Sequence, residues 1–325
     1  MRVGVVVLVL GAVTIQVGAS PEPLTFVRAI ELPHVEGRID HLAFDPATQR
    51  LYVAALGNNT VEVLDVKGGL HLRSLPGFRE PQGIAVAADT RAVGVANGQG
   101  AGVQLLTADD YRPGAMVRLG DDADNVRYDA AARRFYVGYG DGALAAIDPA
   151  AGTLIGQVKL AGHPESFQLE REGSRVFVNV PSAEQIAVVD RASMKVMTTW
   201  ALTARANYPM SLDEANHRVF IGCRRPARVL VLDTASGKES ASFEIVGDTD
   251  DLFYDAARRR VYVSGGDGFI DVVEDQGGNR FTRIVHVATA AGARTSLFVA
   301  EQGRLYLAVP HRGNQRAEVR VYDVH

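Results

Sequence analysis

The sequence has almost no cysteine: among 325 residues, Cys223 stands alone. A single thiol cannot form a disulfide within the chain, so the stability of the fold must come from packing. No cysteine lies directly after the apolar N-terminal segment, which argues against a lipid-anchored export route. We predict that Cys223, at the end of a predicted strand, is a small buried hydrophobic residue rather than a reactive nucleophile.

Clusters of positive charge are also scarce. Lys and Arg number 34 against 38 Asp and Glu, and the longest basic run covers only residues 258–260. Proteins that bind nucleic-acid phosphates need clustered positive charge, so we expect no nucleic-acid partner. The sequence also lacks a covalent-haem motif, a phosphate-binding loop, a dinucleotide fingerprint and a Gly-x-Ser-x-Gly turn.

Only the N-terminus carries a long hydrophobic run. Arg2 precedes the apolar stretch Val3–Val13, and small residues at 17–19 follow it. This pattern predicts a signal peptide over residues 1–19, cleaved before Ser20, and hence a periplasmic or secreted protein. The run is shorter than the roughly 20 residues that span a bilayer, although an uncleaved anchor is the alternative. We expect no membrane span in the mature chain.

What the sequence does contain is a short phrase that returns seven times. The central residues of the copies lie 42, 42, 41, 43, 42 and 44 positions apart. A period of roughly 40 to 45 residues with four short strands per unit is typical of a β-propeller. We therefore predict an all-β fold, a single seven-bladed propeller over residues 25–325 with four antiparallel strands per blade. The copies of the phrase are Leu51-Tyr52-Val53, Val93-Gly94-Val95, Phe135-Tyr136-Val137, Val176-Phe177-Val178, Val219-Phe220-Ile221, Val261-Tyr262-Val263 and Leu305-Tyr306-Leu307.

The two ends of the chain predict how the ring closes. The last copy ends with a third strand at Val319–Asp323 and has no fourth. An extra strand, Phe26–Ile30, precedes the first copy and has no blade of its own. We predict that this N-terminal strand completes the last blade and thereby closes the ring.

The first copy reads Tyr52-Val53-Ala54-Ala55, followed by Asn59-Thr60-Val61-Glu62-Val63-Leu64-Asp65. With this phrase the chain resembles the YVTN-repeat propellers of the YncE type, over about residues 25–325. The resemblance implies an exported seven-bladed propeller, and it implies no particular activity.

Some charged residues recur at fixed offsets from the phrase, which indicates a shared structural task. Five copies carry an acid seven positions before the central residue together with an arginine two positions before it. These residues flank a turn, where the acid can bind backbone groups and the arginine can pair across it. The pairs are Asp45 and Arg50, Asp129 and Arg134, Glu170 and Arg175, Asp213 and Arg218, and Asp255 and Arg260.

Twelve positions before each central residue the copies stop resembling one another. We expect these positions to surround one mouth of the central channel. The residues there are Asp40, Gln82, Asp124, Glu165, Tyr208, Asp250 and Arg294, followed directly by His41, Gly83, Asn125, Ser166, Pro209, Asp251 and Thr295. Because adjacent residues of a strand point to opposite sides, His41 should find its partner in another blade rather than in Asp40.

Four carboxylates that converge on one axis repel one another unless a positive charge compensates. A hard cation such as Ca²⁺, which prefers six to eight oxygen ligands, is one possibility. The other is internal, with Arg294 and Arg38 neutralising two of the acids. The candidate metal ligands are Asp40, Asp124, Glu165, Asp250 and Asp251, with Asn125 nearby.

The hairpins between second and third strands should open on the same face and add further polar residues. The predicted ligand-binding set is His41, Gln82, Asn125, His163, Tyr208, Arg224, Arg225, Arg294, His311 and Arg312. These residues suggest a monomeric binding module for a small molecule or a protein. The alternative is a metal-assisted, lactonase-like hydrolase or lyase in which His41 or Glu165 moves the proton. A third interpretation treats the polarity as simple solvation of a channel mouth.

Overall fold

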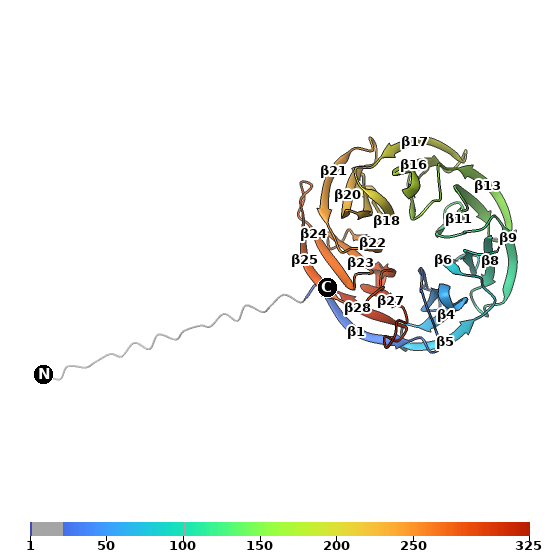
Figure 1. Ribbon diagram of the computed structural model, residues 1–325, viewed down its shortest axis with the longest axis horizontal. Coiled ribbons are helices and arrows are strands. Elements are labelled where there is room, and N and C mark those ends of the chain that lie inside the picture. Colours follow the sequence, from blue (N-terminus) through green and yellow to red (C-terminus); the bar gives the residue numbers. More distant parts are fainter. Residues whose placement is uncertain (2–21, 101) are drawn as a thin grey trace.

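A computed structural model describes Met1 and residues 22–100 and 102–325, so the predicted signal peptide falls, apart from Met1, outside the described residues. Seven four-stranded antiparallel sheets follow one another around a ring (Figure 1). The predicted seven-bladed propeller is therefore confirmed. Each blade begins at the central channel with its first strand and ends at the outer rim.

The first six blades each use four consecutive strands. Blade one holds β2 (Leu42–Asp45), β3 (Arg50–Ala55), β4 (Thr60–Asp65) and β5 (Leu70–Leu75). Blade two holds β6 (Pro81–Ala87), β7 (Ala92–Asn97), β8 (Gly102–Thr107) and β9 (Pro113–Arg118). Blade three holds β10 (Val126–Asp129), β11 (Arg134–Tyr139), β12 (Ala143–Asp148) and β13 (Thr153–Lys159).

The second half of the ring repeats this order. Blade four holds β14 (Phe167–Leu169), β15 (Arg175–Val180), β16 (Gln185–Asp190) and β17 (Lys195–Ala201). Blade five holds β18 (Arg205–Asp213), β19 (Arg218–Arg225), β20 (Ala227–Asp233) and β21 (Glu239–Glu244). Blade six holds β22 (Thr249–Asp255), β23 (Arg260–Gly265), β24 (Phe269–Asp275) and β25 (Phe281–Ala288). Short 3₁₀ turns cover Leu56–Asn58, Pro181–Ala183, Glu214–Asn216 and Ala300–Gln302.

Blade seven joins the two ends of the chain. Its strands lie in the order β26 (Ser296–Val299), β27 (Arg304–Val309), β28 (Glu318–Val324) and β1 (Leu24–Glu31). β1 pairs antiparallel with β28, and Ile30 lies opposite Val319. Leu24 and Ile30 are both 2% exposed and belong to two different hydrophobic clusters, one on each side of the blade. The predicted closure by the N-terminal strand is confirmed.

The repeated phrase supplies the core between the blades. Its aromatic residues are almost fully buried, and each packs in a cluster drawn from two neighbouring blades, as Tyr52 does with Ile84 and Val95. The copy with Gly94 differs because the ring of Phe135 occupies the space that a side chain would need: an added Cβ would lie 3.3 Å from it. Cys223 is fully buried, as predicted, and burial raises the pKa of its thiol to about 12.

The recurring acids bind turn backbone as predicted, but their arginine partners differ from the expectation. Asp213 and Glu170 pair with the arginines of their own turns, Arg218 and Arg175. Asp45 instead pairs with Arg91 of blade two, 2.9 Å away, and Asp129 with Arg191 of blade four, while Asp255 pairs with Arg258 rather than with the predicted Arg260. Asp45 and Asp129 are thus each bound by an arginine of the next blade, across a blade boundary.

Asp45 offers a direct test of this role. Burial alone would raise the pKa of Asp45, but hydrogen bonds from Arg91, Thr48 and Ala47 outweigh it and hold the pKa below its usual value. Replacing Asp45 by Asn should lower the free energy of unfolding at pH 7 by about 2 kcal/mol, since charged hydrogen bonds are lost. A carboxyl group whose pKa is lower in the folded than in the unfolded state stabilises the folded protein at pH values above the unfolded-state pKa of about 3.9. The difference in unfolding free energy between Asp45→Asn and wild type should therefore shrink as the pH falls below this value.

Chemical denaturation at several pH values measures this difference. Asp109 is the matched control, because it binds the same Arg91 but its side chain is 67% exposed. Asp109→Asn should change the stability by less than about 0.5 kcal/mol. Equal effects of the two variants would contradict the structural role of Asp45.

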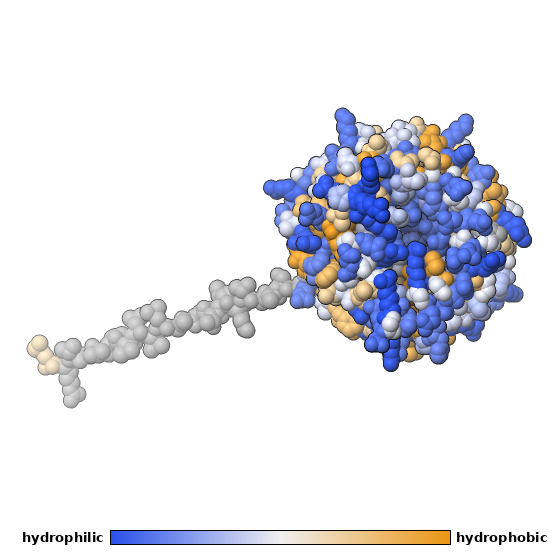
Figure 2. All heavy atoms as spheres, in the orientation of Figure 1, coloured by the Kyte–Doolittle hydropathy of each residue, from blue (hydrophilic) through white to orange (hydrophobic). Residues whose placement is uncertain are grey.

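The surface gives little sign of one large apolar patch on the face drawn in Figure 2, where hydrophobic residues are scattered among hydrophilic ones. Over the described part of the chain, no helix has both the length and the apolar character needed to cross a bilayer.

Candidate functional site

The seven variable positions lie where the chain enters the innermost strands. Gln82, Tyr208 and Asp250 lie in β6, β18 and β22, and the other four stand two residues before β2, β10, β14 and β26. Most of these side chains are buried: Asp40 is 1% exposed, Asp124 7% and Asp250 8%. Buried charges must be paired or bind a ligand, so the partners of each one indicate what the mouth can do.

His41 lies at the centre of three carboxylates. Its Nδ1 is 3.6 Å from Oδ2 of Asp251, and its Nε2 is 3.9 Å from Oδ1 of both Asp124 and Asp40. The predicted partner from another blade is confirmed, since Asp251 belongs to blade six and Asp124 leads into blade three. Asp40 approaches as well, because residues 40 and 41 precede β2 and strand alternation does not separate them.

The charge on His41 follows from this environment. Burial alone would lower the pKa of His41, but the carboxylates of Asp251, Asp40 and Asp124 outweigh it and raise the pKa to about 10. The imidazole is therefore positively charged at neutral pH. Its positive charge compensates part of the negative charge of the three surrounding carboxylates.

Four of the seven variable positions carry carboxylates, and arginines bind two of these, Asp40 and Asp250. This arrangement corresponds to the internal compensation that was one of the two possibilities predicted from the sequence. Arg38 donates to Oδ2 of Asp40 over 2.9 Å. Nη2 of Arg224 donates to Oδ1 of Asp250 over 2.6 Å. Nε of Arg294 lies 2.9 Å from Oδ2 of Asp250, but the geometry is not that of a hydrogen bond. Burial raises the pKa of Asp40 to about 6, against the opposing charges of His41 and Arg38.

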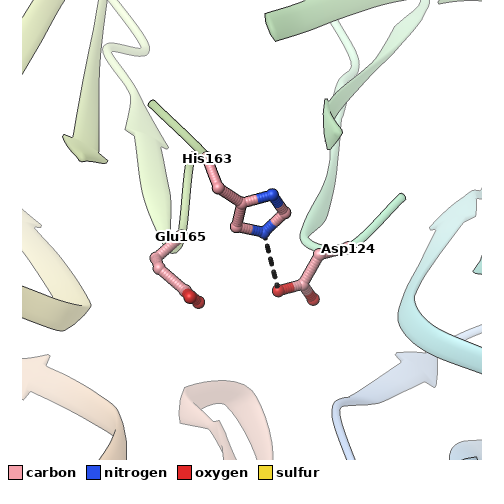
Figure 3. A group of neighbouring side chains, drawn as sticks. All are labelled: Asp124, His163 and Glu165. Atoms are coloured by element: carbon pink, nitrogen blue, oxygen red, sulfur yellow. Dashed lines mark ion pairs between the residues drawn. The ribbon is translucent and has the colours of Figure 1, made fainter. Parts of the chain in front are cut away.

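The other two carboxylates, Asp124 and Glu165, meet His163 (Figure 3). One ligand atom from each of these three residues lies within 4.8 Å of the others. His163 Nε2 is 3.9 Å from Oδ2 of Asp124, and His163 Nδ1 is 2.7 Å from the carbonyl oxygen of Gly140. Burial, together with the charges of Asp124 and Asp250, raises the pKa of Glu165 to about 8. This cluster joins the loops that lead into blades three and four.

A pocket of about 520 Å³ opens beside this cluster, between blades four and five. His163, Glu165, Tyr208 and Arg225 line it, and all four were predicted to bind ligands or metal. The guanidinium of Arg224 stacks on the ring of Tyr208 at 3.8 Å from its centroid, which fixes one wall. The remaining lining residues are Pro181, Ser182, Glu184, Arg205 and Ala206.

Several predicted residues lie elsewhere. Gln82 donates to Asp122 across the boundary between blades two and three, and Asn125 is 1% exposed. His311 pairs with Glu36 at 2.7 Å, near the outer closure of the ring. Arg312 packs over Gly292, where an added Cβ would lie 2.5 Å from its Cζ. None of these four lines the pocket between blades four and five.

Arg127 was not predicted from the sequence as part of the site. Burial lowers the pKa of this arginine in β10, although Asp251 and Asp124 act in the opposite direction. This half-buried guanidinium places another positive charge near the carboxylates that surround His41. The sequence contained a signal for Arg127: it is a charged residue at a position where four other blades hold an apolar one. These residues are Ala43, Ala85, Phe253 and Leu297 in blades one, two, six and seven.

Asp122 and Asp248 were missed as well. They lie two positions before Asp124 and Asp250, and they contact Gln82 and Arg294. Counting two residues further back in each copy would have found a second charged layer.

No protein-family model and no curated protein matches this sequence. Solved structures do resemble it in shape. A chain of the Kuenenia stuttgartiensis hydrazine synthase aligns with a TM-score of 0.75 and 14% identity, over 89% of this chain and 97% of that one. A chain of a mitotic checkpoint complex aligns with a TM-score of 0.79 and 13% identity, over 100% and 99%. U3-55K aligns with a TM-score of 0.79 and 10% identity, over 92% and 98%. Such low identities show the propeller fold and nothing about activity.

Proposed function

We propose that this chain is an exported propeller of the YncE type that binds a small, carboxylate-bearing molecule in the pocket between blades four and five. The observation that carries the proposal is the convergence of His163, Glu165, Tyr208 and Arg225 on one pocket of about 520 Å³. Pockets of roughly 300 to 1,000 Å³ with a few convergent polar groups are typical of small-ligand sites. Export rests on the sequence of residues 1–19.

Arg225 favours a carboxylate. Among the described residues it forms no ion pair, and its side chain is exposed at the pocket. The neighbouring Arg205, by contrast, is bound to Glu184 at 3.0 Å. A planar guanidinium without an acidic partner is suited to a two-point contact with a carboxylate. The ring of Tyr208, held by Arg224, supplies an apolar surface for the body of the ligand.

Calorimetric titration with acetate, succinate, glutarate and benzoate tests this proposal. We expect at least one of these acids to bind with a Kd below about 1 mM, while the matched amides, such as succinamide and benzamide, bind at least tenfold more weakly. Arg225→Ala should reduce carboxylate affinity at least tenfold, the size of one charged hydrogen-bonded contact.

Arg171→Ala provides the control, because Arg171 lies in the turn between β14 and β15 and does not line this pocket. It should leave binding unchanged. Equal affinity for acids and amides, or binding that survives the loss of Arg225, would contradict the proposal. A protein partner at the same mouth is the remaining form of the binding function, in keeping with a fold that generally serves binding and scaffolding.

A metal-assisted hydrolase or lyase is the second candidate. The ligand atoms of Asp124, His163 and Glu165 favour it, because they converge beside a pocket that could hold a substrate. A cation there would polarise a carbonyl or acidify water. Turnover of a lactone or ester that requires added cation and is lost in Glu165→Gln would select this function over binding alone.

A further inference from the structure

We propose that Asp124, His163 and Glu165 hold one divalent transition cation of the zinc type, with an open coordination position that faces the pocket between blades four and five. This inference deepens the proposed function and rests on it for the ligand, since a carboxylate could bind the cation and Arg225 together. The cation site itself rests on four observations about these three side chains.

The first observation is the distance between the ligand atoms. They lie within 4.8 Å of one another, and the contact between His163 Nε2 and Asp124 Oδ2 is 3.9 Å. Ligands at about 2.0 to 2.2 Å from a tetrahedral zinc ion are about 3.4 Å apart. Small rotations of the Glu165 and His163 side chains, which are half-buried at the pocket, are enough to close this difference.

The orientation of His163 is the second observation. A carbonyl oxygen only accepts, so Nδ1 of His163 must donate its proton to Gly140 over the 2.7 Å contact. With Nδ1 bound in this way, Nε2 faces Asp124 and is the ring nitrogen that a cation would bind after displacing its proton. Histidines that bind metals are commonly oriented in this way, with the other ring nitrogen donating to a carbonyl or carboxylate.

Asp124 supplies the third observation. The residue is 7% exposed, and Oδ1 has no hydrogen-bond partner among the described residues. A buried carboxylate oxygen without a hydrogen-bond donor costs free energy of folding, so Asp124 can accept a further partner besides the charged His41. The nearest histidines, His41 and His163, both stop 3.9 Å short of its oxygens.

The fourth observation is a contrast within the ring. Asp40 and Asp250 are bound by arginines, whereas no arginine among the described residues lies within 4.0 Å of the Asp124 or Glu165 carboxylate. Arginines therefore compensate one pair of these acids, whereas at the other pair, in the described part of the chain, only the histidines His41 and His163 approach, each to 3.9 Å from Asp124. The two acids left over are the ones that meet a histidine.

These ligands favour a transition cation over the Ca²⁺ expected from sequence. Calcium needs six to eight oxygen ligands, and two of the acids assigned to it are occupied by Arg38, Arg224 and Arg294. One imidazole with two carboxylates suits Zn²⁺ or its neighbours instead. Three protein ligands leave a coordination position open, as in catalytic rather than structural zinc sites.

Direct metal binding tests the inference. The whole chain, treated with a chelator and then freed of it, is titrated with Zn²⁺ and, separately, with Co²⁺ while the visible spectrum is recorded. We expect one equivalent of Zn²⁺ with a Kd at or below about 10 µM and a Co²⁺ spectrum typical of four- or five-fold coordination. His163→Ala and Glu165→Gln should each weaken binding at least tenfold, as loss of a direct ligand does.

His311→Ala is the matched control, because His311 is a histidine of the rim outside the cluster, paired with Glu36. It should leave Zn²⁺ binding unchanged. Melting curves without metal identify any variant that fails to fold, and Glu165→Gln, which keeps the shape of the side chain, then carries the test. Less than about a tenth of an equivalent of bound Zn²⁺ and Co²⁺, binding unchanged in both ligand variants, or a response to Ca²⁺ alone would overturn the inference.

The same protein separates this inference from the proposed function. If carboxylates bind metal-free protein through Arg225 and no cation binds, the inference is wrong and the binding function survives. If the cation binds while no acid does, the site stands and the proposed ligand is wrong.

Discussion

A chain that begins at residue 33, and so lacks β1, is expected to give no soluble monomer. β1 provides the outermost strand of blade seven, paired with β28 over most of its length. Its removal exposes the edge of the C-terminal strand and leaves the sites of Leu24 and Ile30 empty. Burying two such side chains contributes about 3 to 6 kcal/mol, which approaches the total stability of many domains.

A chain that begins at residue 22 is the matched control, because it retains β1 and lacks residues 1–21. It should elute as a monomer in size-exclusion chromatography, with the circular dichroism of a β protein. A synthetic peptide of residues 22–33, added during refolding of the shorter chain, should restore part of the soluble product. The importance of this closure would be disproved by a chain from residue 33 that is monomeric and melts at the same temperature as the control.

Replacing His41 by Ala is the second change with a large expected effect. His41 carries a positive charge among Asp251, Asp40 and Asp124, which would otherwise repel one another. Breaking a buried ion pair by removing one partner costs about 3 to 5 kcal/mol, and we expect a loss of that size in the free energy of unfolding at pH 7. Chemical denaturation measures it.

A double-mutant cycle identifies the cause of this loss. If His41 acts through Asp251, then Asp251→Asn should cost less in the His41→Ala background than in wild type, with a coupling of about 2 kcal/mol. His311→Ala removes a histidine of a more exposed pair and should change stability by less than about 0.5 kcal/mol. Additive effects of the changes at His41 and Asp251 would show that the two side chains do not interact.

The sequence could predict the architecture because the architecture repeats. Copies of one phrase about 42 residues apart imply one buried position per blade. The additional strand at Phe26–Ile30 can pair only with the last blade, which otherwise lacks a fourth strand. The offset that located Asp124 and Glu165 follows from the same repetition. The spacing of the repeat is thus sufficient to locate the loops that surround the channel.

What the sequence could not supply is the choice of partner. Asp45 binds Arg91 rather than Arg50, and Arg50 binds Asp65, because the reach of each guanidinium across a blade boundary depends on packing in three dimensions. Asp250 and Asp124 occupy equivalent positions, yet only Asp250 meets arginines. Asp250 differs from Asp124 because Arg224, near the C-terminal end of β19, and Arg294, in the loop before β26, both reach it.

The contacts of His41 have a mechanical consequence for the ring. A propeller whose blades touch only their neighbours can open at one joint while the others stay closed. His41 precedes blade one and contacts acids of blades three and six, each two blades away around the ring. Separating blade one from either neighbouring blade would therefore also lengthen a contact between His41 and an acid two blades away. The innermost strands should consequently exchange their amide hydrogens as one cooperative unit rather than blade by blade.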